Sequence, residues 1–367
     1  MIILRILAFL FGVAIVIATL GSAIKTFVLP RGASDRITRF VFRSMSRIFR
    51  LYTNRVESFA RRDSVMALFS PVTLLVLAIS WMALVGLGYM LMFWAISDDG
   101  LGQAFLLSGS SLLTLGFALA KTLPQAALAF SEAAIGLILI ALLISYLPTM
   151  YSAFSRREAA VTLLSVRAGE PPSAAELISR YARIQGLDKL DDLWPQWELW
   201  FAEIEESHTS LGSLVFFRSP QPDHSWVTAA GAVLDAAALR AAALDLPRDP
   251  QAELTIRAGF LALRRIAAFF GITYPPDPHF PETPISIAQY EFVLACQHMA
   301  EGGAPIKADL EQAWHDFAGW RVNYDAVLLA LAQLTMAPYA PWSSDRTLPQ
   351  QRLPERLTLG GQVEPEQ

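Results

Sequence analysis

The sequence has little charge and almost no cysteine. Of its 367 residues only 17% are charged, whereas 54% are apolar and the mean hydropathy is +0.39. An ordinary soluble protein carries more charge, so the composition indicates a membrane protein with an attached soluble part. The single cysteine, Cys296, excludes a disulfide within the chain.

Motifs of soluble chemistry are also missing. No Gly-x-Gly-x-x-Gly follows a strand-like run, so a nucleotide-binding Rossmann-like regulator is not expected. No Ser/His/Asp order can be tied to a geometry, and we predict no enzyme activity. The histidines include no i, i+4 pair and no Cys-x-x-Cys accompanies them, so we predict no metal site and no cofactor. They are His208, His224, His279, His298 and His315.

Charge is divided unevenly along the chain. Residues 1–167 carry 15 Lys/Arg and 7 Asp/Glu, whereas the remainder carries 14 and 26. A basic membrane half and an acidic soluble half argue against nucleic acid as a partner.

Three apolar segments, at about 6–24, 66–96 and 126–154, are long enough to span a membrane. The first could instead be a signal peptide, although its length favours a retained helix. Between the first two lie residues 31–62, with nine arginines, and so short a basic loop should stay in the cytoplasm. We therefore expect a multi-pass protein of the plasma (cell inner) membrane, with its N-terminus outside and its long C-terminal part cytoplasmic.

The basic loop is predicted to form an amphipathic helix over residues 34–59. Five arginines recur at steps of three or four and form one stripe, with apolar side chains lying mostly away from it. They are Arg36, Arg39, Arg43, Arg47 and Arg50. Such a helix is typical of the membrane interface, where anionic lipid attracts it. Two other interpretations remain. The helix could be a slide helix that carries cytoplasmic motion to the pore, or it could be a solvated connector.

The stretch between the second and third apolar segments is too short and too polar to span. Residues 102–113 predict a short helix, which Thr114-Leu115-Gly116-Phe117-Ala118 follow. Non-helical backbone at membrane depth is stable only inside protein or along a water-filled path, so we expect a re-entrant loop. These five residues resemble the pore-loop signature of potassium channels, Thr-x-Gly-Tyr/Phe-Gly, with Ala118 in place of the last glycine.

The resemblance implies a pore-loop channel of the two-transmembrane-helix family. In such a homotetramer four loops replace the hydration shell of potassium or another monovalent cation with backbone carbonyls. The ion pathway would comprise Thr114, Leu115, Gly116, Phe117 and Ala118. A left-handed Ala118 would cost roughly 1 kcal/mol, so a less selective cation pore is a variant of this hypothesis. Leu119 stands where the family has aspartate, and Lys121 disfavours cations at the mouth. The alternative to an ion pathway is a loop that packs between helices and does not conduct.

The third apolar segment contains three sites where a residue could support, bend or gate a pore. Glu132 could favour the outer end of the helix, brace the loop as a pore support, or attract cations. Gly136 marks either a bend or a close helix contact. Pro148, accompanied by Ser145, predicts a kink and a cytoplasmic gate at residues 145–151.

From about residue 156 the composition becomes that of a soluble domain. Residues 168–173 predict a linker, and helices are expected near 173–185, 193–208, 225–244, 250–270, 285–299 and 308–336. Cap-like residues precede four of them: Ser173, Asp192, Ser225 and Asp249. Residues 214–217 are the one strand-like run. The aromatic-rich 193–201 predicts core or a subunit contact, and Arg218 predicts an ion pair or an anion site.

The predicted fold class is therefore an all-α membrane protein. Its parts are an N-terminal transmembrane helix (1–30), a basic interfacial helix (31–62), a two-helix pore-loop domain (63–157), an all-α cytoplasmic domain of unknown ligand (158–338) and a disordered tail (339–367). The predicted function is a cation channel subunit gated by an unidentified cytoplasmic signal. A non-conducting membrane scaffold or sensor that acts through its helical domain is the alternative.

Overall fold

A computed structural model describes residues 2–27, 35–53 and 59–346. The chain divides into two compact units, residues 1–55 with 68–152, and residues 56–67 with 153–367. Within the described residues every regular element is a helix, which confirms the predicted all-α class. Three of these helices are long and apolar enough to cross a membrane, namely Ile2–Phe27, Ser64–Ile96 and Leu123–Ala168.

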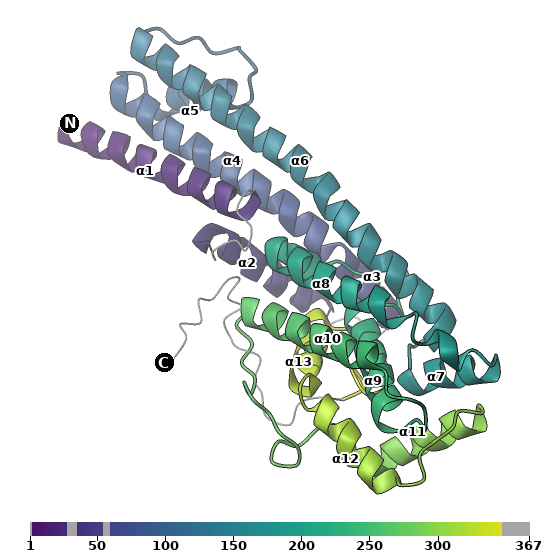
Figure 1. Cartoon of the computed structure of the whole chain (residues 1–367). Helices are drawn as coiled ribbons and strands as arrows, with labels where there is room; N and C mark the ends of the chain where they lie inside the picture. Colours follow the sequence, from purple (N-terminus) through teal and green to yellow (C-terminus); the bar gives the residue numbers. More distant parts are fainter. Residues whose placement is uncertain (1, 28–34, 54–58, 347–367) are drawn as a thin grey trace. The chain divides into compact units, whose positions relative to one another are not determined.

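The first unit contains α1 (Ile2–Phe27), α2 (Arg36–Thr53), α4 (Phe69–Ile96), α5 (Leu101–Leu112) and the first part of α6 (Leu123–Ala168) (Figure 1). The predicted helix over 34–59 ends at Thr53, and residues 54–58 lie outside the described part. The third apolar helix does not end near residue 154, as predicted, but continues without a break to Ala168.

Helices α1 and α4 pack antiparallel and very closely. Arg5 forms an ion pair with Asp98 at 2.8 Å, beyond the end of α4. Gly12 and Gly88 face each other, and a Cβ added at Gly88 would lie 2.8 Å from the Gly12 carbonyl oxygen. Small residues that let two backbones approach are typical of helix pairs in membranes. That α1 is retained, and is not a signal peptide, stays a prediction.

A chain of polar side chains joins α1, α4 and α2. Trp81 Nε1 donates to Ser22 Oγ at 3.0 Å, and Ser22 donates to Asp35 Oδ2 at 2.5 Å. Asp35 also accepts the backbone N–H groups of Ile37 and Thr38, which caps the start of α2. The buried polar atoms of α1 and α4 therefore fix where the basic helix begins.

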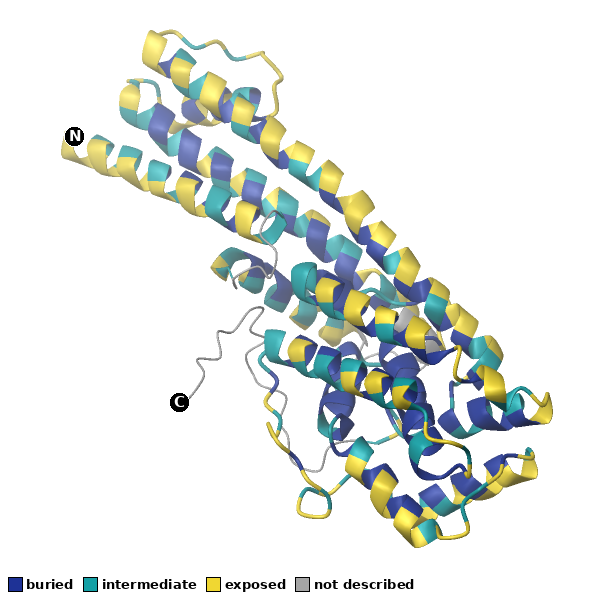
Figure 2. Ribbon diagram, in the orientation of Figure 1, coloured by how far each residue is buried: buried dark blue, intermediate teal, exposed yellow. Residues whose placement is uncertain are grey.

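Helix α4 is the most deeply buried of the three long helices. In its most apolar stretch 39% of residues are buried, against 17% for α1 and for α6 (Figure 2). Large apolar side chains of α6 are exposed in the single chain, among them Phe130 at 76% and Ile144 at 64%. The outer faces of α1 and α6 thus remain available for lipid or for other copies of the chain.

The second unit is built around α9 (Trp226–Ala242), nearly all of whose residues are buried. Around it lie α7 (Ala174–Arg183), α8 (Trp194–Ser210), α10 (Pro250–Phe269), α11 (Gln289–Glu301), α12 (Leu310–Arg321) and α13 (Asp325–Thr335), together with α3 (Phe59–Ala67) and the end of α6. The aromatic-rich segment belongs to the core, since Trp194 and Phe201 are fully buried. Three predicted caps are confirmed: Ser173, Ser225 and Asp249 each accept a backbone N–H of the following helix.

Three expectations for this unit are wrong. Leu193 rather than Asp192 caps α8, and it makes no side-chain cap bond. The strand-like run lies in a 3-10 helix, Gly212–Phe216, because Leu214 N and Phe217 N bond locally to the third residue back. The single helix expected over 308–336 is two, α12 and α13. The Asn323 side chain donates to two carbonyls at the end of α12, which competes with continuation of the helix.

The predicted tail begins later than expected. Arg346 donates to Ser286 O at 2.6 Å and to the Glu291 carboxylate at 2.9 Å, and Ala340 is fully buried. Residues 339–346 therefore belong to the packed second unit. The remainder of the predicted tail lies outside the described residues.

Candidate functional site

The segment between α4 and α6 forms a helix and a loop that return to their starting end. Helix α5 follows Asp99, and at the far end of the loop Lys121 Nζ lies 3.0 Å from the Asp99 carboxylate. Lys121 N also donates to Gln125 Oε1 in the first turn of α6. A helix of 12 residues is about 18 Å long. Its length is thus about half the thickness of a bilayer hydrocarbon core, which is about 30 Å.

The loop is held to the end of α5 by Ser110. Leu115 N donates to Ser110 O at 2.8 Å, five residues back, and Ala118 N donates to Ser110 Oγ at 3.0 Å. Thr114 has a φ of 54°. A left-handed residue followed by such a bond is the Schellman ending of a helix, in which glycine is usual at the position that Thr114 occupies.

The backbone strain expected at Ala118 lies elsewhere. Among residues 114–118 the positive φ angles are those of Thr114 and of Gly116, which has a φ of 72°. The expectation of a left-handed Ala118 is therefore wrong. The reason is the turn itself, because ending α5 requires the left-handed conformation at Thr114, and Ser110 then draws the N–H of Ala118 inward.

The carbonyl oxygens of the loop are free to bind something else. Within the described part of the chain no hydrogen-bond donor reaches the carbonyl oxygens of residues 114–118. The side chains of Leu115 and Phe117 are 60% and 62% exposed. Backbone carbonyls need a hydrogen-bond donor or a cation as a partner, so these can bind water, an ion or further protein.

Glu132 and Gly136 contact α5 rather than the loop. Glu132 is fully buried, and its Oε1 lies 2.6 Å from Ser108 Oγ. A Cβ at Gly136 would clash with the Leu112 carbonyl oxygen, so Gly136 marks a close helix contact and not a break in α6. Both residues thus position the end of α5, to which the loop is bonded through Ser110.

The predicted gate residues lie in an unbroken stretch of α6. Ser145 Oγ donates to Leu142 O at 2.9 Å, and Pro148 lies inside the helix. Both side chains are exposed, whereas Tyr146 between them is buried against Phe27, with ring centroids 4.4 Å apart. Gating at this point stays a prediction.

The arginine stripe lies on the outer side of α2. Thr38, Val41 and Phe42 are the buried residues of this helix, and Phe42 contacts Phe69 of α4 edge-on. Arg36, Arg47 and Arg50 are exposed, whereas Arg39 and Arg43 are half-buried. Exposed apolar residues lie beside the stripe on the same outer surface: Phe40, Ile48, Leu51 and Tyr52.

Sequence reasoning missed two buried charge clusters in the second unit. Arg157 contacts Glu158 and His208, and it donates to the carbonyls of Leu214 and Phe217. Burial, together with the charge of Arg157, lowers the pKa of His208 well below its ordinary value, so this histidine is neutral. The only signal of this cluster in the sequence was the pair Arg156-Arg157 at the end of the third apolar segment.

The second cluster centres on Arg321, which is fully buried. It donates to Asp235 at 2.6 Å, to Asp325 at 2.7 Å and to the Trp342 carbonyl. Tyr324 adds a hydrogen bond to Asp235 at 2.8 Å. Because every charged member has partners, the cluster is a structural link between α9, α12 and α13 rather than a reactive site.

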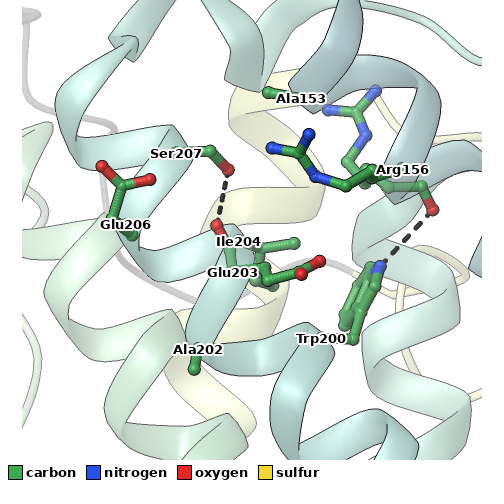
Figure 3. A pocket seen from close by; sticks show the side chains of 9 residues that line it. Ala153, Arg156, Trp200, Ala202, Glu203, Ile204, Glu206 and Ser207 are labelled. Atoms are coloured by element: carbon green, nitrogen blue, oxygen red, sulfur yellow. Dashed lines mark hydrogen bonds between the residues drawn. The ribbon is translucent and has the colours of Figure 1, made fainter.

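Two clefts lie among the described residues of the second unit. One of about 280 Å³ lies between the end of α6 and α8, where Arg156 faces Glu203 and Ser207 (Figure 3). Another, of about 420 Å³, lies beside Tyr290 and His298, but His298 is paired with Glu176 at 2.9 Å. In the part of the chain that the structure describes, no three His, Cys, Asp or Glu side chains gather as metal ligands.

Arg218 contacts the end of α13, and the predicted ion pair or anion site stays a prediction. Its guanidinium donates to the carbonyls of Thr335 and Met336 at 2.7 and 2.8 Å, which satisfies the end of α13.

Comparison of the chain with protein-family models, with curated proteins and with solved structures finds no significant match.

Proposed function

We propose that the chain is a subunit of a homotetrameric cation channel, in which residues 114–118 of four copies line the ion path. The observation that carries the proposal is the short helix α5 and the loop after it, whose five carbonyl oxygens have no donor within the described chain. A ring of such carbonyls can replace the hydration shell of potassium or another monovalent cation.

The C-terminal end of α5 favours binding of a cation rather than an anion at the loop. The C-terminus of a helix carries about half a negative charge, and α5 ends where the loop begins. At the mouth Lys121 is paired with Asp99, which offsets the positive charge that the lysine would otherwise present. Both features favour a positive ion near the loop.

The exposed faces of the first unit support several copies in a membrane. One loop supplies only part of a carbonyl ring, and the exposed apolar side of α6 offers a surface that other copies can cover. In the proposed channel, α2 lies at the cytoplasmic interface, with its arginines on anionic headgroups and Phe40 and Leu51 among the acyl chains. The second unit is then cytoplasmic, and residues around Ser145 and Pro148 form the gate.

The decisive experiment measures potassium and sodium flux from liposomes that contain the purified full chain. Gly116→Ala should abolish flux, because a left-handed alanine costs roughly 1 kcal/mol or more in each subunit and turns the central carbonyls. Gly109→Ala is the matched control, because an added Cβ there meets no atom within 4 Å. Equal flux in both variants would place the ion path elsewhere, and no flux in the parent would favour the scaffold or sensor.

Two further measurements test the assembly and its orientation. The mass in lipid nanodiscs should correspond to four copies, and a stable monomer would defeat the channel proposal. In a Cys296→Ala background, an engineered Ser46→Cys should be unreactive to an impermeant thiol reagent applied to intact cells. Labelling of that cysteine would put α2 on the outer side.

A further inference from the structure

Glu132 is an acid buried without any cationic partner. It is fully buried, and neither α4 nor α5 contains a charged residue. On α6 the next charged side chain is that of Arg156. The phenol of Tyr89 on α4 is a titratable group close enough to interact with Glu132, and it bonds to the neighbouring Ser131 at 2.8 Å. Such isolation is unusual, because intramembrane acids are rare and commonly pair or serve a function.

The contacts of Ser108 specify the form in which the acid is held. Ser108 Oγ lies 2.9 Å from the Gly86 carbonyl oxygen and 2.6 Å from Glu132 Oε1. A hydroxyl has one hydrogen to donate, and a backbone carbonyl can only accept. If Ser108 donates to Gly86, the hydrogen in the shorter contact must come from Glu132. A charged carboxylate would leave one of these two contacts without a hydrogen.

The second carboxyl oxygen points to the same form. Glu132 Oε2 is buried and has no hydrogen-bond partner among the described residues. An unpaired carbonyl oxygen of a neutral acid costs far less in an apolar site than an unpaired charged oxygen does. The neutral acid therefore supplies a hydrogen to both contacts of Ser108 and leaves only an uncharged oxygen unpaired, whereas the carboxylate leaves one Ser108 contact without a hydrogen.

We propose that Glu132 is a proton-binding site, in which the neutral acid latches α6 to α5 through the chain Glu132–Ser108–Gly86. Ser110, which holds the loop by its carbonyl and its hydroxyl, lies two residues beyond Ser108 on α5. Loss of the proton makes Glu132 an acceptor only, so the Ser108 hydrogen turns to the carboxylate, and the bond from Ser108 to the Gly86 carbonyl of α4 is lost. The latch follows from contacts inside one chain and is independent of whether the loop conducts.

Infrared spectroscopy of the full chain in lipid vesicles tests the proton directly. The wild type at neutral pH should show a carboxylic-acid C=O band that Glu132→Gln removes and that fades as the pH is raised. Ser108→Ala should shift this band, because the acid loses its acceptor. Ser131→Ala is the matched control, since that hydroxyl bonds to Tyr89 and to Leu128 O, and it should leave the band unchanged. If Glu132→Gln removes only a carboxylate band at neutral pH, the proposal is overturned.

Thermal unfolding in detergent gives a second measurement. The amide of Glu132→Gln can donate to Ser108 as the neutral acid does, so this variant should melt close to the wild type at neutral pH. It should also lose less stability than the wild type at alkaline pH, where the wild-type acid gives up its proton. A large loss in Glu132→Gln that Glu132→Asp does not share would show that negative charge is required, and would contradict the latch.

Discussion

The two units bury charge in opposite ways. In the second unit the fully buried Arg321 donates to Asp235 and Asp325, so each charge has a charged partner. In the first unit Glu132, also fully buried, contacts only the Ser108 hydroxyl among the described residues. A charge is retained in an interior only when it is paired, whereas an unpaired acid in an apolar interior tends to be neutral.

The units also join their helices differently. The first unit relies on close backbone approach, at Gly12 with Gly88 and at Gly136 with Leu112. The second relies on a large aromatic and aliphatic core around α9. Lipid supplies no hydrophobic drive for two apolar helices to associate, so close contact and hydroxyl bonds take its place in the membrane unit.

Removing Arg321 should have the largest effect on stability. Although burial opposes its charge, Asp235 and Asp325 raise the pKa of Arg321 above its ordinary value. Arg321→Ala leaves both carboxylates buried without this partner, and we expect a loss of about 3–5 kcal/mol. Chemical unfolding of the full chain in detergent, followed by tryptophan fluorescence, measures it. Arg248→Ala, which breaks an exposed pair with Glu253, should cost much less. Equal losses would mean that burial of the Arg321 cluster adds nothing to its effect on stability.

Close approach in the first unit is tested at Gly136. The methyl group of Gly136→Ala would meet the Leu112 carbonyl oxygen, so α5 must move away from α6, and we expect a loss of about 1–3 kcal/mol. Gly109→Ala adds the same methyl group where nothing lies within 4 Å, and it should be neutral or slightly stabilising. Melting temperatures in detergent compare the two variants. A Gly136→Ala protein as stable as Gly109→Ala would mean that the α5–α6 contact is loose.

What the sequence could predict depended on local patterns. Long apolar runs predicted the three membrane-length helices, and serine or aspartate before a periodic run predicted the caps at Ser173, Ser225 and Asp249. The pairing of Asp235 with Arg321 joins residues 86 positions apart, and no period or spacing signals it. Thr114 was not predicted as the left-handed residue because a β-branched side chain disfavours that conformation. The ion path, the tetramer and the gate stay predictions.

Glu176 in the second unit offers an intermediate case, an acid that is paired but only partly buried. Partial burial alone would raise its pKa, yet hydrogen bonds from Arg180 and His298 and the charge of Arg183 lower it to about 2. A depressed folded-state pKa contributes stability above the ordinary value of 4.5 that is lost as the pH falls towards 2. Glu176→Gln should therefore flatten the loss of stability over this range, in acid titrations monitored by tryptophan fluorescence. An unchanged acid profile would show that Glu176 does not contribute to it.

The smallest expected effects concern how the units end their helices. In the second unit left-handed glycines follow α6, α10 and α11, namely Gly169, Gly271 and Gly303, whereas in the first unit Thr114 ends α5 with a φ of 54°. Thr114→Gly should relieve roughly 1 kcal/mol of backbone strain and raise the melting temperature. Ala118→Gly relieves none, because its φ is not positive, and the added chain freedom should lower stability by about 0.5–1 kcal/mol.

The opposite signs of these two substitutions make the pair informative, because both introduce glycine in the same loop. If the loop conducts, Ala118→Gly should leave the potassium-to-sodium flux ratio close to that of the parent, since Ala118 N stays bonded to Ser110 Oγ. Stabilisation by Ala118→Gly, with none by Thr114→Gly, would mean that Ala118 is the left-handed residue. The backbone would then follow the potassium-channel pattern more closely than the Schellman ending of α5 allows, and Ser110 would no longer be what holds the loop.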